Sequence, residues 1–233
     1  MQPYFFPYFG YFQLIASTDV FVAYDDVNYI KGGWINRNNI LLNGQKQLVS
    51  LALNAKSSFK KINEIEIADE RLTKTRQKFL RTIEQAYRKA PNFTIVYEQI
   101  IKKNIENGRN KLSEINITIL RDICSYLEIK TEIIVASESE KIIQTSNYHS
   151  ADRVKEICKI LQASTYINAI GGQELYDKED FKNSGLNLCF IEPNHFFYQQ
   201  YKSDFIPALS IIDVIMFSEK EIVMSHLDDY NLV

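Results

Sequence analysis

The second half of the chain alternates short apolar segments with amphipathic ones. From residue 131 onward the strand-like segments TEIIVAS, TYINAI and LNLCFIE are separated by the helical patterns SADRVKEICKILQA and QELYDKEDFKN, and two amphipathic patterns follow, ALSIIDVIMF and EKEIVMSHLDDY. Strands that are joined through helices pair in parallel, because each crossover returns the chain to the same end of the sheet. The alternation therefore predicts an α/β fold with a mainly parallel, Rossmann-like sheet.

The first half adds a strand, a hairpin and a group of helices. DVFVAY predicts a buried strand, and ILLNGQKQLVSLAL predicts a hairpin that turns at Asn43-Gly44. Three helical patterns fill residues 69–127, separated at Pro91 and Asn107-Gly108, and we interpret them as a helical insert or side layer. Since neither a repeat nor a linker interrupts the chain, residues 1–233 are expected to form a single domain.

Composition excludes several classes of protein. The formal net charge of −2 and the pI near 6.0 argue against a dedicated nucleic-acid binder. No apolar run approaches the roughly 20 residues of a membrane span, and the opening MQPYFFPYFGYFQLI lacks the basic region of a secretory signal, so it is expected to belong to the folded protein. The three cysteines are far apart, which suits reduced thiols in the cytoplasm, and no metal site is expected.

The loop after DVFVAY is the first candidate for a binding site. Ligands of open parallel sheets bind beyond the carboxyl ends of the strands. In this loop, basic side chains would hold phosphate, a carboxylate would hold a metal or an amine, and an aromatic ring would stack on a base or a sugar. The candidates are Asp25, Asp26, Lys31, Trp34, Asn36 and Arg37. The alternative is a solvated surface loop that Trp34 anchors.

The loop after TYINAI is the second candidate. Asn168 ends this strand, and Gly171 and Gly172 would let backbone N–H groups approach an anion at the start of the next helix. Tyr176 would face the same crevice and is a catalytic candidate. The alternative is an ordinary turn from strand to helix.

Two further residues are candidates because of their position. His195 follows the apolar strand LNLCFIE, where an imidazole could exchange protons near neutral pH. Asp213 lies in the otherwise apolar pattern ALSIIDVIMF, and a carboxylate there must be paired or must face a cavity. His195 could equally be structural, and Asp213 could be a clamp between a helix and a loop.

Five motifs, in this order, resemble the WbqC-like protein family over almost the whole chain: QPYFFPYFGYFQLI, YDDVNYIKGGWINRNNI, KAPNF, YINAIGGQELYDKEDF and FIPALSIIDVIMF. Members of this family typically lie in bacterial gene clusters for O-antigen and other surface polysaccharides. The resemblance therefore implies the transfer of an aminoacyl or acyl group onto an amino sugar. Members also carry a few apolar residues before the Gln-Pro pair, so the resemblance implies that a first strand is missing or shortened here.

The opening is also similar in layout to the nucleotide-binding start of pantothenate synthetase and the nucleotidylyl transferases. Those enzymes bind a nucleotide through two histidines, and Tyr8 and Tyr11, or nearby rings, would stand in their place. With Gln2 these phenols would surround Gly10 at the mouth of the sheet. Phenols carry no positive charge, so the use of ATP and Mg²⁺ stays open.

The leading hypothesis is a transferase that forms an amide on a nucleotide-linked amino sugar. In it Lys31 and Arg37 hold phosphate, Tyr8 and Trp34 stack on the base or the sugar, Asp25 positions the amine, and His195 accepts the proton. One alternative is a non-catalytic nucleotide-sugar-binding or scaffold protein of the same pathway. The other, nucleic-acid binding, is disfavoured by the net charge; its residues would be Lys31, Arg37, Lys60 and Lys61. The sequence leaves the oligomeric state open.

Overall fold

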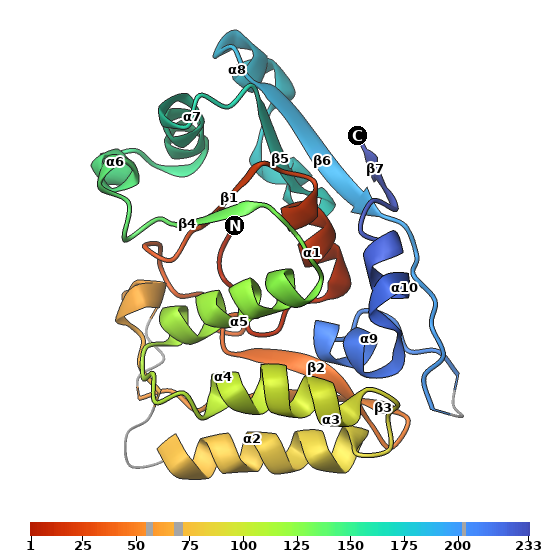
Figure 1. Cartoon of the computed structure of the whole chain (residues 1–233). Helices are drawn as coiled ribbons and strands as arrows, with labels where there is room; N and C mark the ends of the chain where they lie inside the picture. The colour runs from red at the N-terminus through yellow and green to blue at the C-terminus, as the bar shows by residue number, and fades with distance from the viewer. Residues whose placement is uncertain (55–57, 68–71, 202–203) are drawn as a thin grey trace.

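The strands form small sheets that lie among the helices (Figure 1). The computed structural model describes residues 1–54, 58–67, 72–201 and 204–233. Within these residues, three separate sheets contain two, two and three strands. Their strands are β1 (Val20–Ala23) with β4 (Glu132–Val135), β2 (Arg37–Leu42) with β3 (Gln45–Ser50), and β5 (Thr165–Ala169) with β6 (Asn187–Pro193) and β7 (Tyr230–Leu232).

Helices and short helical turns lie before and between the strands along the chain. In the first half they are α1 (Phe9–Ala16), η1 (Ile62–Glu64), α2 (Leu72–Tyr87), α3 (Phe93–Val96), the π-helix η3 (Tyr97–Lys102), α4 (Lys103–Ile105) and α5 (Leu112–Tyr126). In the second half they are α6 (Glu140–Ile143), η4 (Gln144–Asn147), α7 (Ser150–Ile160), η5 (Ile170–Leu175), α8 (Lys178–Asn183), α9 (Ile211–Phe217) and α10 (Lys220–Ser225).

The mixed α/β class is confirmed, but the single Rossmann-like sheet is not. β1 runs parallel to β4, with Phe21 opposite Ile133, and β5 runs parallel to β6, with Ile167 opposite Cys189. The two pairs belong to separate sheets in the described residues. The last expected helix, over EKEIVMSHLDDY, is shorter than its pattern: α10 ends at Ser225, and β7 adds an antiparallel strand beside β6. β7 is short and mostly exposed, so the apolar alternation that marks a strand is missing.

The hairpin prediction is confirmed. β2 and β3 pair antiparallel from Arg37 opposite Ser50 to Leu42 opposite Gln45. Asn43 and Gly44 form the turn with φ angles of 52° and 75°. Positive φ at both positions matches the right-handed twist of the flanking strands, and asparagine and glycine adopt it at little cost.

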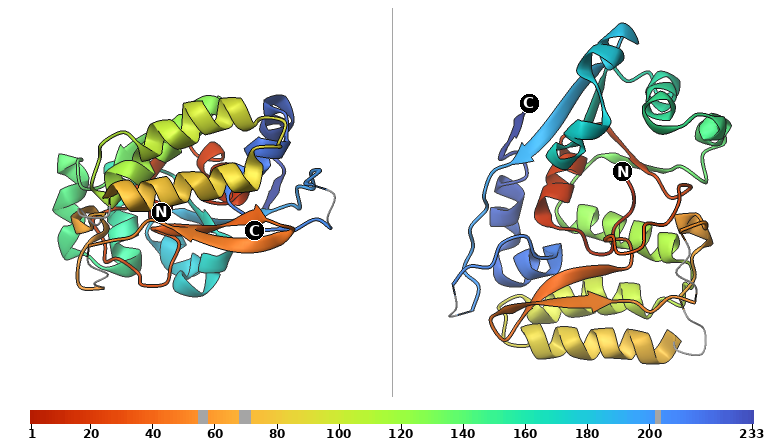
Figure 2. Two further views of the ribbon diagram at one scale, coloured as in Figure 1. Left: turned by 90° about the horizontal axis from the view of Figure 1, so that it is seen from below. Right: turned by 180° about the vertical axis from the view of Figure 1, so that it is seen from behind.

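The predicted helical region is mostly helical: α2, α3, η3, α4 and α5 lie within its three patterns, whereas residues 88–92 and 106–111 are not helical. Its expected first residue, Asp69, lies outside the described residues, and α2 begins at Leu72. Phe79, Ile83 and Tyr87 of α2 belong to the same buried cluster as Phe12 of α1 and Ile215 of α9. These helices therefore share the main core, and Figure 2 shows their ribbons from two further directions.

The aromatic opening is part of this core, as expected. Phe5, Phe6, Tyr11 and Phe12 are fully buried. The amino group of Met1 donates to the carbonyl oxygen of Val22 (3.0 Å), and the N–H of Tyr24 donates to the carbonyl oxygen of Met1 (2.8 Å). The opening thus lies along β1. In the part of the chain that the structure describes, no helix has the length and apolar character needed to cross a membrane.

Candidate functional site

The start of α1 is crowded around Gly10. A Cβ at this position would lie 2.7 Å from a ring carbon of Tyr8 and 2.8 Å from Cγ of Pro193, at the end of β6. Only glycine permits this close approach. Tyr8 is the N-cap residue, but its side chain makes no capping hydrogen bond, and the first turn of α1 contains no acidic residue. The helix therefore begins without a negative charge at its positive end.

The segment before α1 is held in an uncommon conformation. Phe6 has a φ of 43°, which non-glycine residues rarely adopt. Its carbonyl oxygen accepts hydrogen bonds from Nδ2 of Asn38 (2.7 Å) and from the hydroxyl of Ser210 (2.7 Å). These contacts come from β2 and from the residue before α9, and together they stabilise the strained turn that presents Tyr8.

Tyr8 and Tyr11 have different surroundings. The side chain of Tyr8 is 37% exposed, whereas the ring of Tyr11 is fully buried. The hydroxyl of Tyr11 donates to the carbonyl oxygen of Gln2 (2.6 Å), and burial raises the pKa of Tyr11 well above its usual value. Tyr8 can therefore meet a ligand directly, while Tyr11 supports the backbone of Gln2.

The first predicted loop separates into exposed and anchored residues. Trp34 is 42% exposed, and its carbonyl oxygen accepts from the N–H of Phe5 (3.0 Å), so it lies beside the opening. Lys31 is also exposed. Asn36 is buried and donates to the carbonyl oxygen of Leu51 (2.8 Å). Nε of Arg37 donates to the carbonyl oxygen of Gly33 (3.0 Å), which directs the guanidinium toward its own loop.

Asp25 joins the ends of β1 and β4. Its Oδ1 accepts from the N–H of Ser137 (3.0 Å), and its Oδ2 accepts from the hydroxyl of the same residue (2.7 Å). Burial raises the pKa of Asp25, while the two hydrogen bonds from Ser137 oppose that shift. Asp25 thus holds the two parallel strands in register at their carboxyl ends.

Asp26 forms a buried ion pair with Arg153 of α7. The guanidinium also donates from Nε to the hydroxyl of Thr145 (3.1 Å) and lies 4.6 Å from the ring centre of Tyr24. Burial alone would lower the pKa of Arg153, but the hydrogen bond to Asp26 raises it overall. Oδ1 of Asp26 is buried and has no hydrogen-bond partner among the described residues.

The second predicted loop is tighter than expected. Asn168 is buried, and a Cβ at Gly172 would lie 2.6 Å from its Nδ2, so Gly172 is required for this contact. Gly171 has open space at the same position. The residues after Asn168 form the 3₁₀ helix η5, and Tyr176 follows it with its ring 5.6 Å from that of Tyr166.

His195 and Asp213 lie in contrasting environments. His195 is exposed on the segment after β6, and its ring lies 5.8 Å from that of Phe197. Asp213 is fully buried. Its oxygens accept from the hydroxyls of Tyr87 (2.8 Å) and Tyr198 (2.7 Å) and from Nε2 of Gln200 (2.8 Å).

Only some of the predicted residues lie together, and these form two groups. Gln2, Tyr8, Gly10 and Tyr11 cluster at the start of α1, with Trp34 attached through Phe5. Asp25 and Asp26 form the second group, at the ends of β1 and β4. Among the described residues, no hydrogen bond or ring contact links the three catalytic candidates, His195, Asp25 and Tyr176.

Sequence reasoning missed three partners of these residues. Ser137 follows an apolar strand, and this position could have marked it as a candidate. Arg153 resembled a solvent-exposed charge on an amphipathic helix, and Pro193 had no distinguishing signal. Their roles depend on contacts between segments that are far apart in the chain.

A nucleotide site with two histidines does not fit the start of α1. The hydroxyl of Tyr11 is already used by Gln2, and its ring is fully buried. Tyr8 is exposed enough to donate one hydrogen bond, but it carries no positive charge. If a phosphate binds here, these phenols cannot hold it as histidines would.

Comparisons with known proteins agree with the sequence motifs. The sequence model of the WbqC-like protein family matches residues 2–224. A protein of Mycobacterium tuberculosis (strain ATCC 25618 / H37Rv), described as "Uncharacterized protein Rv1507c", is 28% identical over 221 residues, which cover 92% of this chain and 90% of that protein. No solved structure matches the chain.

Proposed function

This chain belongs to the WbqC-like protein family, and from that premise we propose that it is an amide-forming transferase for a nucleotide-linked amino sugar in surface-polysaccharide biosynthesis. The family resemblance supplies the substrate class. The observation that carries the proposal is the start of α1, which has no acidic residue in its first turn, with the partly exposed ring of Tyr8 at its N-cap and the partly exposed Trp34 bonded through its carbonyl oxygen to Phe5 of the opening.

Each feature of this region suits one part of such a ligand. An uncapped helix start favours a phosphate group, because backbone N–H groups and the helix dipole both attract negative charge. Exposed aromatic rings favour the flat face of a base or a sugar. Lys31, which is exposed on the same loop as Trp34, would add a positive charge for a second phosphate.

The proposed reaction joins an amine to an acyl group. The amine nitrogen of the sugar attacks the carbonyl carbon of an activated acyl donor, the C–N bond forms, and the bond to the leaving group breaks with its electron pair. His195 accepts the proton that the amine loses. Asp25, which Ser137 holds by hydrogen bonds, lies at the strand ends where the amine would be positioned. Tyr176, at the end of η5, would contact the substrate from that side.

Mass spectrometry tests the reaction directly. The protein is incubated with a UDP- or dTDP-linked amino sugar and with glycine plus ATP or an acyl thioester. We expect the sugar mass to rise by the mass of the acyl group less one hydrogen, and we expect His195→Gln to lower the rate by about 100-fold or more, as loss of a general base does. His149→Gln is the matched control, because His149 is another exposed histidine and should leave the rate unchanged.

Two tyrosine variants test the binding site separately. We expect Tyr8→Phe to weaken nucleotide-sugar binding by about three- to tenfold, the effect of one hydrogen bond, without changing the melting temperature. Tyr11→Phe should instead lower stability by about 1 kcal/mol, because it removes the hydrogen bond to Gln2. Isothermal titration calorimetry and thermal unfolding measure the two effects. Unchanged binding in Tyr8→Phe would contradict the placement of the ligand.

The second candidate function is non-catalytic binding of a nucleotide sugar or scaffolding in the same pathway. Both oxygens of Asp25 are engaged by Ser137, and no described residue hydrogen-bonds to the ring of His195 to orient it as a base. The same experiments separate the two functions. Ligand binding with an unchanged sugar mass under every donor would favour the binding protein.

A further inference from the structure

The outer face of α2 carries a row of exposed cationic and amide side chains. Each lies three or four residues from another member of the row, so that together they follow one side of the helix and continue one residue past its end. The row consists of Lys74, Gln77, Lys78, Arg81, Gln85 and Arg88. Such a stripe is wider than the isolated basic residues of an ordinary helix surface, and one acidic residue, the exposed Glu84, lies at its edge.

A shallow surface pocket lies between the side chains of this row. This cavity of about 240 Å³ is lined by Lys74, Gln77, Lys78, Arg81, Thr82 and Gln85. All of these side chains can donate hydrogen bonds, so the hollow suits acceptor oxygens that carry negative charge.

The cations of the row are not neutralised within the described protein. Lys74, Lys78, Arg81 and Arg88 form no salt bridge with a described residue, whereas Lys102 and Lys103 of the neighbouring helical segments are paired with Glu98 and Asp122. The acidic side chain on this helix, Glu84, accepts a hydrogen bond from Tyr97 (2.6 Å). Residues 72–89 contain six basic residues and one acidic residue in a chain whose net charge is −2. The positive charge is therefore concentrated on this element.

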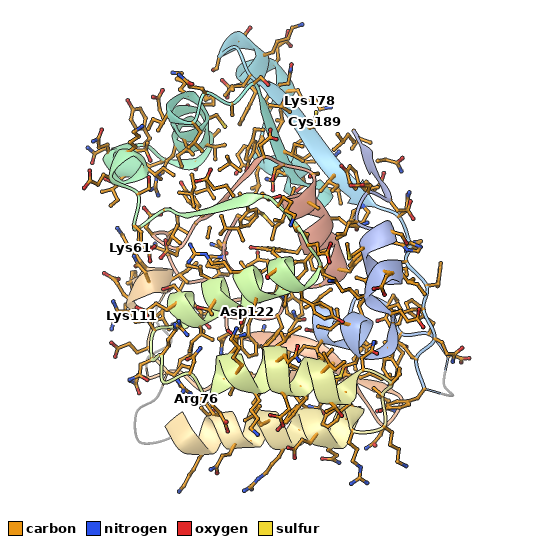
Figure 3. All side chains as sticks on the ribbon, viewed as in Figure 1. Lys61, Arg76, Lys111, Asp122, Lys178 and Cys189 are labelled. Carbon is orange, nitrogen blue, oxygen red and sulfur yellow. The ribbon has the colours of Figure 1, made fainter. Side chains whose placement is uncertain are left out.

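α2 lies at the outer edge of the molecule, with the other helices and the sheets on one side of it (Figures 1 and 2). Side chains with nitrogen ends extend from its outer side, away from the rest of the protein (Figure 3). A partner of any size can reach this face.

We propose that the outer face of α2 docks the protein on an anionic phospholipid surface. The row offers charge over several helical turns, as a layer of phosphate headgroups requires. It carries no apolar side chain to insert between lipid tails, so the contact is electrostatic and superficial. It also carries no aromatic ring on which bases could stack, which disfavours single-stranded nucleic acid as the partner.

Cosedimentation with vesicles tests the proposal. Full-length protein is mixed with vesicles of phosphatidylcholine containing about 30% phosphatidylglycerol, and with vesicles of phosphatidylcholine alone, at about 50 and 300 mM salt. We expect binding to the anionic vesicles only, and weaker binding at high salt because the Debye length shortens. Lys78→Glu with Arg81→Glu should lower the partition coefficient by about tenfold or more.

A matched variant separates this face from total charge. Lys130→Glu with Lys141→Glu makes the same change in net charge at exposed positions outside α2, and its binding should stay within about twofold of the wild type. Both variants are first compared with the wild type by thermal unfolding. Asp69 and Glu70 precede α2 outside the described residues, so the substitutions are placed at the centre of the row.

Several outcomes would overturn the proposal. These are equal binding to neutral and anionic vesicles, no binding to either, and an equal loss of binding in the two double variants. Tighter binding to a single-stranded oligonucleotide than to the anionic vesicles at the same salt would assign the face to nucleic acid. The test does not involve the start of α1, so it can fail or succeed independently of the proposed reaction.

Discussion

Asp213 illustrates how the surroundings of one carboxylate determine its role. It lies in α9 without exposure to solvent, and hydroxyl and amide donors from Tyr87, Tyr198 and Gln200 contact its oxygens. Burial raises the pKa of Asp213 because the charged form loses its hydration, while the three donors oppose this shift. Asp213 thus links α9 to α2 and to the segment after β6, and it serves as an anchor for both.

The raised pKa of Asp213 gives a prediction for stability. A carboxyl whose pKa is higher in the folded than in the unfolded protein contributes stability below its unfolded pKa, and this contribution is lost as the pH rises through the folded value. Asp213→Asn cannot titrate. We therefore expect the wild type to exceed this variant in free energy of unfolding most near pH 4, and by less as the pH approaches 7. Urea denaturation at several pH values measures the difference.

Asp228→Asn provides the control for this series. Asp228 is exposed, so its replacement should change the free energy of unfolding by no more than about 0.5 kcal/mol at any of these pH values. An advantage of the wild type over Asp213→Asn that grows toward pH 7 would mean that the three donors outweigh burial, and it would contradict the prediction.

At the scale of elements, the entry to α1 is determined by three segments that meet there. The strained Phe6 is held by Asn38 from β2 and by Ser210 before α9, and Pro193 at the end of β6 presses against Gly10. Because these contacts come from separate elements, the position of Tyr8 depends on the whole assembly around α1. Removing one contact should displace the ring.

Gly10→Ala tests this packing. The added Cβ would lie less than 3.0 Å from both Tyr8 and Pro193, so one of them must move. We expect a loss of about 1–3 kcal/mol in the free energy of unfolding, typical of overpacking, and weaker ligand binding. Gly171→Ala is the control, because its Cβ meets open space and its effect should stay within about 0.5 kcal/mol. If Gly10→Ala were as stable as the control and bound ligand normally, the close approach would have no structural role.

The elements that local sequence determines were predictable. The Asn43-Gly44 turn and the strands around it follow from short-range patterns of apolar and turn-forming residues. β7 was missed because its three residues are mostly exposed and show no apolar alternation, so only its pairing with β6 identifies it as a strand. The ion pair between Asp26 and Arg153 joins residues 127 positions apart, which no local pattern encodes. The individual candidates could therefore be named from the sequence, but not their partners.

At the scale of the whole molecule, the described residues form four buried clusters, one of them much larger than the others. The main cluster includes Phe5 near the start of the chain and Leu227 near its end. A second cluster surrounds Phe181 and contains side chains of α7, α8 and β6. The alternation of strands and helices predicted parallel pairing, which β1–β4 and β5–β6 show, but it could not indicate that these pairs lie in separate sheets, because strand order depends on contacts between distant segments.

Specific contacts connect the main cluster with this second one, and they lead to a prediction for unfolding. Gln13 of α1 donates to the carbonyl oxygen of Asp229 (2.9 Å), just before β7, and Asp26 pairs with Arg153 of α7. We expect one cooperative transition in urea, with fluorescence of Trp34, the single tryptophan, coinciding with far-UV circular dichroism. In native-state hydrogen exchange, amides of β6 and α5 should open with free energies that agree within about 1 kcal/mol. Opening of β6 at a clearly lower free energy, with the fluorescence of Trp34 still that of the native protein, would show two units and contradict the single domain.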